Sequence, residues 1–162
     1  RRDLGRRQGN VESLMGEKLR YAEEGEVHLD FHGATNTTID SIIDRFGVEA
    51  MDEIFRKVGR DVYRSIHEDL VAGDTRQLVE HWRHFFTRED CDYDIEIGRD
   101  EIVLTVRRCT AWHHVARLVG TPSPHFCDQT IRTNEALAEG SPFAFETTIT
   151  GPGACRQVIR RR

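Results

Sequence analysis

The first half of the chain carries apolar residues three to four positions apart, which is the spacing of amphipathic helices. A modest apolar stripe covers residues 11–22, and a clearer one begins at Ile39 and runs to Phe46. After Gly47 a longer stripe spans residues 51–70, and a further one covers 75–87. The pattern therefore predicts several helices before any strand, with a break at Gly47.

The second half of the chain changes to a period of two, which is typical of half-buried strands. Two alternating runs, at 93–97 and 102–106, flank a turn, and two more, at 143–149 and 155–159, flank Gly151-Pro-Gly153. Between these hairpins the sequence predicts two helices, at 111–118 and 124–139. The order is helices, ββ, αα, ββ. It predicts an α+β fold in which a four-stranded antiparallel sheet packs against helices on one face.

The length of 162 residues suits one domain, which we place at 11–162 behind a flexible basic arm at 1–10. The whole chain has 23 basic and 28 acidic residues. Seven arginines and one aspartate lie in residues 1–7 and 160–162, so the body keeps 16 basic against 27 acidic residues, a net charge of −11. This acidic body argues against nucleic-acid binding.

No apolar run approaches the roughly 20 residues that a membrane span requires, and the N-terminal residues do not resemble an export signal. We therefore expect a cytoplasmic protein that does not bind membranes. The sequence sets no oligomeric state, so a homo-oligomer stays open.

The segment 28–36 is polar and has no helical period. Its histidines, His28 and His32, are four residues apart with Asp30 between them, and on a helix they would share a face as metal-binding histidines do. The missing period instead favours a polar loop with helix caps at Thr35 to Thr37. We expect His32 to face a pocket together with the cysteines described next.

Four cysteines, Cys91, Cys109, Cys127 and Cys155, are dispersed without any CxxC pair. Free thiols in a reducing compartment are the expectation for this pattern. Cys109 follows the second predicted strand, and Cys155 lies near the start of the last one. With Cys127 and one histidine these thiols would form a zinc site; the alternative is that they are buried or incidental.

Cys127 stands in the most informative local string, Ser123-Pro124-His125-Phe126-Cys127. Ser123 and Pro124 predict a helix start, which would place Cys127 one turn into the helix. A helix N-terminus lowers the pKa of a thiol, so Cys127 is a candidate nucleophile or metal ligand. We also expect it to alkylate faster than Cys91, which stands between two aspartates. The alternative is a small buried hydrophobe.

Asn134 falls on the same predicted stripe as Cys127 and Ala138. A polar amide on a core stripe needs either a hydrogen-bond partner or a pocket. No glycine-rich phosphate loop, GxSxG or HExxH motif occurs in the chain. This excludes the simplest dinucleotide, P-loop, serine-hydrolase and zinc-protease interpretations.

Residues 28–160 resemble the L-2-amino-thiazoline-4-carboxylic acid hydrolase-like family. The resemblance is carried by Val106-Arg-Arg-Cys109-Thr-Ala, Ser123-Pro-His-Phe126-Cys127-Asp, Asn134-Glu-Ala-Leu-Ala-Glu-Gly140, Phe145-Glu-Thr, Cys155 and Asp30-Phe-His-Gly33. The family positions matched one by one are Cys109, Phe126, Cys127, Asn134, Gly140 and Cys155. The chain departs from the family at Thr110, where proline is common.

The resemblance implies a hydrolase that cleaves a C–N or related bond in a small heterocyclic or amino-acid-derived substrate. We expect Cys127 to act as nucleophile, His32 as base and Asp30 as the acid that orients His32. Phe126, Asn134 and His125 are the expected substrate contacts. In a metal version, Cys109, Cys127 and Cys155 hold a divalent ion such as zinc, which activates water.

The alternative function is a noncatalytic domain that senses a small ligand or a metal in a pocket between sheet and helices. Bound ligand or metal without turnover of any cyclic amidine or amide would favour it.

Overall fold

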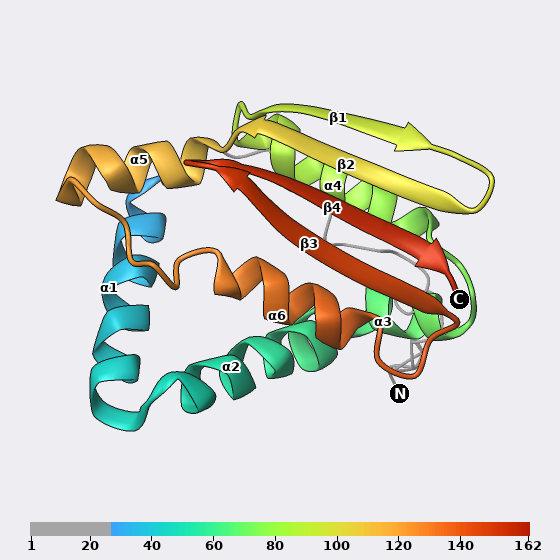
Figure 1. Cartoon of the computed structure of the whole chain (residues 1–162), viewed down its shortest axis with the longest axis horizontal. Coiled ribbons are helices and arrows are strands. Elements are labelled where there is room, and N and C mark those ends of the chain that lie inside the picture. The colour runs from blue at the N-terminus through green and yellow to red at the C-terminus, as the bar shows by residue number, and fades with distance from the viewer. Residues whose placement is uncertain (1–26) are drawn as a thin grey trace, which may run out of the picture.

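The computed structural model describes residues 27–162, so the expected helix at 11–22 and the basic arm at 1–10 lie outside the described residues. The described elements follow the predicted order of helices, ββ, αα, ββ (Figure 1). They are α1 (Asp30–Phe46), α2 (Val48–Lys57), the π-helical segment η3 (Val58–Val62), α3 (Arg64–Val71), α4 (Arg76–Arg88), β1 (Asp92–Ile97), β2 (Glu101–Arg108), α5 (Thr110–Val119), α6 (Asp128–Leu137), β3 (Phe143–Gly151) and β4 (Ala154–Arg161).

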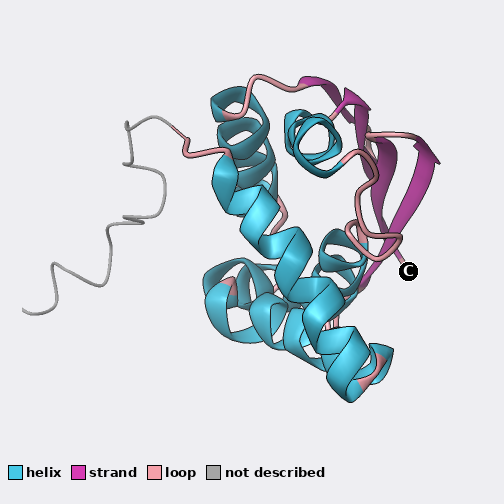
Figure 2. Cartoon of the chain, turned by 90° about the vertical axis from the view of Figure 1, so that its left-hand side faces the viewer, coloured by secondary structure: helices cyan, strands magenta, loops and turns pink. Residues whose placement is uncertain are grey.

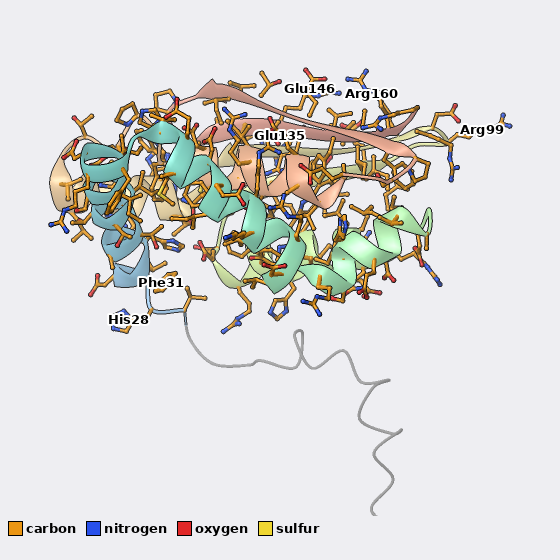
Figure 3. The ribbon with its side chains drawn as sticks, turned by 90° about the horizontal axis from the view of Figure 1, so that it is seen from below. His28, Phe31, Arg99, Glu135, Glu146 and Arg160 are labelled. Atoms are coloured by element: carbon orange, nitrogen blue, oxygen red, sulfur yellow. The ribbon has the colours of Figure 1, made fainter. Side chains whose placement is uncertain are left out.

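The strands form one antiparallel sheet in the order β1-β2-β4-β3, which confirms the predicted α+β fold. The last strand pairs with β2, so the two hairpins join through their second strands. The helices lie on one side of the sheet, as Figure 2 shows. On the opposite side, Glu146 of β3 and Arg160 of β4 form an exposed ion pair with an O–N distance of 2.6 Å (Figure 3). None of the described helices is long and apolar enough to cross a membrane.

Two apolar clusters hold the layers together. The larger lies between the sheet and helices α3, α4 and α6, and it includes Leu104 and Ile159 from the central strands. The smaller joins α1, α2 and α5 beyond one end of the sheet (Figure 1). Cys109 packs against both clusters, because it connects the end of β2 to the start of α5. The clusters therefore meet where the cysteines lie.

Helix α1 begins at Asp30, so the polar segment expected as a loop is helical. Only Asn36 and Ile39 of this helix are buried, which explains the missing apolar period. The Asn36 side-chain oxygen accepts a hydrogen bond from the Ser123 backbone N–H at 2.8 Å. The Thr35 hydroxyl donates to the carbonyl four residues before it instead of capping a helix. As a result His32 sits on a fixed helix.

The expected helix start at Ser123 and Pro124 is also wrong, because these residues form a turn. The Ser123 carbonyl accepts the Phe126 N–H at 3.0 Å, and its hydroxyl accepts the His125 N–H at 3.2 Å. Helix α6 starts only at Asp128, with Cys127 at its N-cap position. The buried bond from Asn36 ties this turn to α1.

Gly59 in η3 lets that segment pack closely on α6. A Cβ at this position would lie 2.7 Å from the Thr133 carbonyl oxygen and 2.9 Å from the Ala136 Cβ. We expect Gly59→Ala to lower the free energy of unfolding by about 1–3 kcal/mol. The reason is that the backbone atoms of α6 cannot move away from the new Cβ as easily as the end of a flexible side chain can. Urea unfolding measures this. Gly151→Ala, whose Cβ meets nothing within 4 Å, is the control, and equal losses in both variants would contradict the packing argument.

Candidate functional site

A pocket lies between the helices and one end of the sheet, where β2 ends and β4 begins. The space enclosed by its walls is about 100 Å³, or about 640 Å³ with the open space at its mouth included. Its walls come from α1, α4, α5, the start of α6 and three strands. The lining residues are His32, Phe85, Phe86, Val106, Cys109, Ala111, Trp112, Phe126, Cys127, Gln129, Thr130, Thr147, Ile149, Gly153, Ala154, Cys155 and Gln157. The structure thus brings Cys109, Cys127 and Cys155 around one cavity with His32.

His32 is held in this wall by Glu89. The His32 Nε2 lies 2.9 Å from Glu89 Oε1, and the two side chains are only 12% and 5% exposed. Glu89 follows the last residue of α4, where its backbone N–H bonds the Phe85 carbonyl. Its second oxygen, Oε2, is buried and has no hydrogen-bond partner among the described residues. A buried carboxylate on one ring nitrogen fixes the orientation of the imidazole.

Asp30, the acid expected to orient His32, lies elsewhere. Its carboxylate pairs with His114 Nε2 of α5 at 3.1 Å, and its side chain is 69% exposed. The acid beside His32 is therefore Glu89, 57 residues further along the chain. Nothing in the sequence marks Glu89 as buried, because charged residues that follow a helix are usually solvated.

The Cys127 thiol is not activated by the helix that follows it. Burial, and then the neighbouring Cys155 and Asp128, raise the pKa of Cys127 to about 11. Desolvation thus outweighs the favourable effect of the helix terminus. Cys127 is a neutral thiol at neutral pH, contrary to the expectation from the sequence.

Cys91 is the acidic thiol of the described chain instead. A hydrogen bond from the Cys109 thiol, together with the Thr110 backbone N–H at 3.4 Å, lowers the pKa of Cys91 to about 7 although burial and Glu89 oppose this. The same bond to Cys91, and then burial, raise the pKa of Cys109. The expected order of the Cys91 and Cys127 pKa values is therefore reversed.

We expect iodoacetamide to modify Cys91 before Cys127 in the folded protein at neutral pH. Alkylation needs the thiolate, and the thiolate fraction rises with pH. The rate at Cys91 should therefore be half-maximal near pH 7, whereas Cys127 should react appreciably only toward pH 11. Peptide mapping at a series of pH values measures both rates. Urea-unfolded protein is the control, in which the difference between the two rates should vanish. Modification of Cys127 faster than Cys91 in the native protein at pH 7 would contradict the prediction.

The predicted zinc site is not formed by this arrangement. Within residues 27–162, no three His, Cys, Asp or Glu side chains are placed so that they could hold a metal ion. Cys109, Cys127 and Cys155 line the pocket without forming a common ligand set, and Cys155 instead lies 3.7 Å from the Gln157 side-chain nitrogen. The described residues therefore do not fit a bound metal ion.

The expected substrate contacts fall in three different places. Phe126 lines the pocket beside Cys127. Asn134 lines an adjoining cavity, and its amide nitrogen donates to Thr147 at 2.9 Å and to Gln157 at 2.8 Å. His125 lines neither cavity, because its ring pairs with Asp128 at 2.7 Å.

The adjoining cavity continues the pocket between α1, α4 and α6. The two cavities share His32, Phe85, Phe86, Gln129, Thr130 and Gln157. This continuity was not predictable from the sequence, because the shared side chains come from α1, α4, α6 and β4. The pairing Leu104↔Gln157 sets Gln157 at the centre of the sheet, where it is buried and accepts the Asn134 bond.

The comparisons with known proteins assign no family to this site. Neither a scan of protein-family models nor a comparison with curated proteins gives a match to the chain.

Proposed function

We propose that this pocket hydrolyses a C–N or related bond of a small heterocyclic or amino-acid-derived molecule. The observation that carries the proposal is the buried His32–Glu89 pair in the wall of a pocket that Cys127 also lines. A nucleophile, a base and an acid that orients the base are the three groups that covalent hydrolysis uses. The resemblance to the L-2-amino-thiazoline-4-carboxylic acid hydrolase-like family supports the same reaction class.

The raised pKa of Cys127 determines how such a reaction proceeds. Because Cys127 is a neutral thiol, it must lose its proton to His32 as its sulfur bonds the electrophilic carbon of the substrate. Glu89 stabilises the imidazolium that forms. His32 then gives the proton to the departing nitrogen or sulfur, and water, deprotonated by His32, releases the product from Cys127. The net reaction consumes one water.

The lining of the pocket selects the kind of substrate. Aromatic side chains such as Phe86, Trp112 and Phe126 form an apolar wall. Gln129 and Thr130 add polar groups, although the Gln129 side-chain nitrogen already donates to the Phe126 carbonyl at 2.7 Å. A small ring with an apolar face and a few polar atoms fits this combination.

The test uses 2-aminothiazoline-4-carboxylate as the probe. Mass spectrometry of the solution should show a product heavier by one water, formed with wild-type protein and not with Cys127→Ser. Cys155→Ser is the matched control, because it changes a thiol of the same pocket that the mechanism does not use. Full turnover by Cys127→Ser would overturn the role of Cys127.

A noncatalytic small-ligand pocket is the second candidate. It is favoured by the absence, within residues 27–162, of a hydrogen bond between His32 and a thiol, and by the neutral Cys127. In this case the probe or a related ring binds with a measurable heat in calorimetry and is recovered unchanged. Binding without turnover would therefore replace the hydrolase proposal.

A further inference from the structure

Cys91 and Cys109 face each other at the open end of the β1–β2 hairpin. In the register of this pair, Asp92 is opposite Arg108. Cys91 directly precedes the first of these residues and Cys109 directly follows the second, so the two cysteines lie opposite each other just beyond the last pair of the ladder, next to a register irregularity between Asp92 and Tyr93. Both are free thiols, and both pack against the same apolar cluster. Their side chains therefore lie on the same face of the sheet.

The spacing of opposing strand positions suits a disulfide. Opposing residues in antiparallel pairs have Cα atoms about 4.5–5.5 Å apart. Disulfides join Cα atoms separated by about 4.4–6.8 Å. The thiols of Cys91 and Cys109 already share a hydrogen bond. Closure of a bond between them thus requires little backbone movement.

The surroundings prepare Cys91 to react first. Its sulfur accepts the backbone N–H of Thr110 at 3.4 Å, and Thr110 is the first residue of α5. The Thr110 hydroxyl donates to the Asp90 carbonyl at 2.8 Å, which fixes the segment before Cys91 to the same helix end. Cys91 is partly exposed, so a small reagent can reach it. The lowered pKa of Cys91 agrees with this geometry.

We infer that Cys91 and Cys109 are a redox-active dithiol that closes to a disulfide by exchange with a low-molecular-weight disulfide. The Cys91 thiolate attacks one sulfur of the small disulfide, forms a mixed disulfide and releases the first small thiolate, which takes up a proton. Cys109 gives its proton to solvent and attacks the Cys91 sulfur, and the second small thiolate leaves and is protonated. Two protein thiols are oxidised, and one small disulfide is reduced to two thiols.

Closure changes the pocket as well as the hairpin. Cys109 lines the pocket, so oxidation removes one of its three thiols and fixes the start of β1 to the start of α5. The inference does not depend on the proposed hydrolysis, whose nucleophile is Cys127. Failure of one therefore leaves the other intact.

The experiment treats the full chain with oxidised glutathione and follows intact mass and peptide maps. Wild-type protein should lose two hydrogens and yield one linked peptide pair, Cys91 with Cys109, which dithiothreitol reverses. Cys109→Ser should stop at the mixed disulfide and keep one glutathione on Cys91. Cys91→Ser should lose the linked pair, whereas Cys127→Ser and Cys155→Ser should keep it.

Two results would overturn the inference. One is wild-type protein that retains glutathione on Cys91 as fully as Cys109→Ser does. The other is a dominant link through Cys127 or Cys155. Far-ultraviolet circular dichroism of each variant verifies that it is folded, and a misfolded Cys91→Ser is replaced by Cys91→Ala.

Discussion

Replacing His32 by glutamine should lower the turnover of the probe by about 10²–10⁴-fold, the usual contribution of a general base. Glutamine cannot take the proton of the neutral Cys127 thiol, although its amide can still bond Glu89. His32 is almost buried in the wall of the pocket, so the change acts where the reaction is proposed. Initial rates by mass spectrometry measure the loss.

The matched control is His125→Gln, which replaces the histidine of another histidine–acid pair of similar length. The His125 pair with Asp128 lies outside the pocket, so this variant should keep wild-type turnover. The turnover of Glu89→Gln should lie between those of His32→Gln and His125→Gln, since this variant keeps the hydrogen bond to His32 and loses the negative charge. Equal rates for His32→Gln and His125→Gln would remove His32 from the mechanism.

Leu104→Ala should lower the free energy of unfolding by about 2–5 kcal/mol. Leu104 lies in the central strand β2 and is 0% exposed within the larger apolar cluster. Its removal leaves a cavity between the sheet and the helices, and a rigid sheet closes such a cavity poorly. Chemical denaturation monitored by circular dichroism measures the change.

Leu118→Ala is the control of the same residue type. Leu118 lies at the end of α5 and is 53% exposed, so its replacement should cost less than about 1 kcal/mol. A loss at position 118 as large as that at 104 would show that the core is placed wrongly. A loss at position 104 below about 1 kcal/mol would show the same.

The strands were predictable from the sequence because apolar and polar residues alternate along most of each hairpin, although the central strands also bury Val103 and Val158 on the other face. Alternation at 93–97 and 102–106 marks β1 and β2, and Gly151-Pro-Gly153 marks the second turn. Helix α1 was not predictable over its first two turns, because its partner there is a polar contact. Asn36 bonds the backbone of Ser123, 87 residues away, and no local apolar pattern reports such a bond.

The candidate site was predictable only in part, for a similar reason. Local spacing drew attention to His32 and Cys127, which the structure places in one pocket wall. Glu89 was missed because its side chain meets His32 of α1, which is 57 residues away in the chain, and no local pattern encodes that contact. The low pKa of Cys91 was missed because its two aspartate neighbours are exposed while Cys109 and Thr110 contact the sulfur.

The most direct test of the hydrolase account is the mass of the protein quenched with acid during turnover of 2-aminothiazoline-4-carboxylate. The account predicts a transient adduct of the substrate skeleton, mapped to Cys127, that decays as product accumulates and is absent from Cys127→Ser. It also predicts that His32→Gln forms this adduct slowly. Product formation without any adduct on Cys127, or an unchanged probe bound without a covalent bond, would contradict the account.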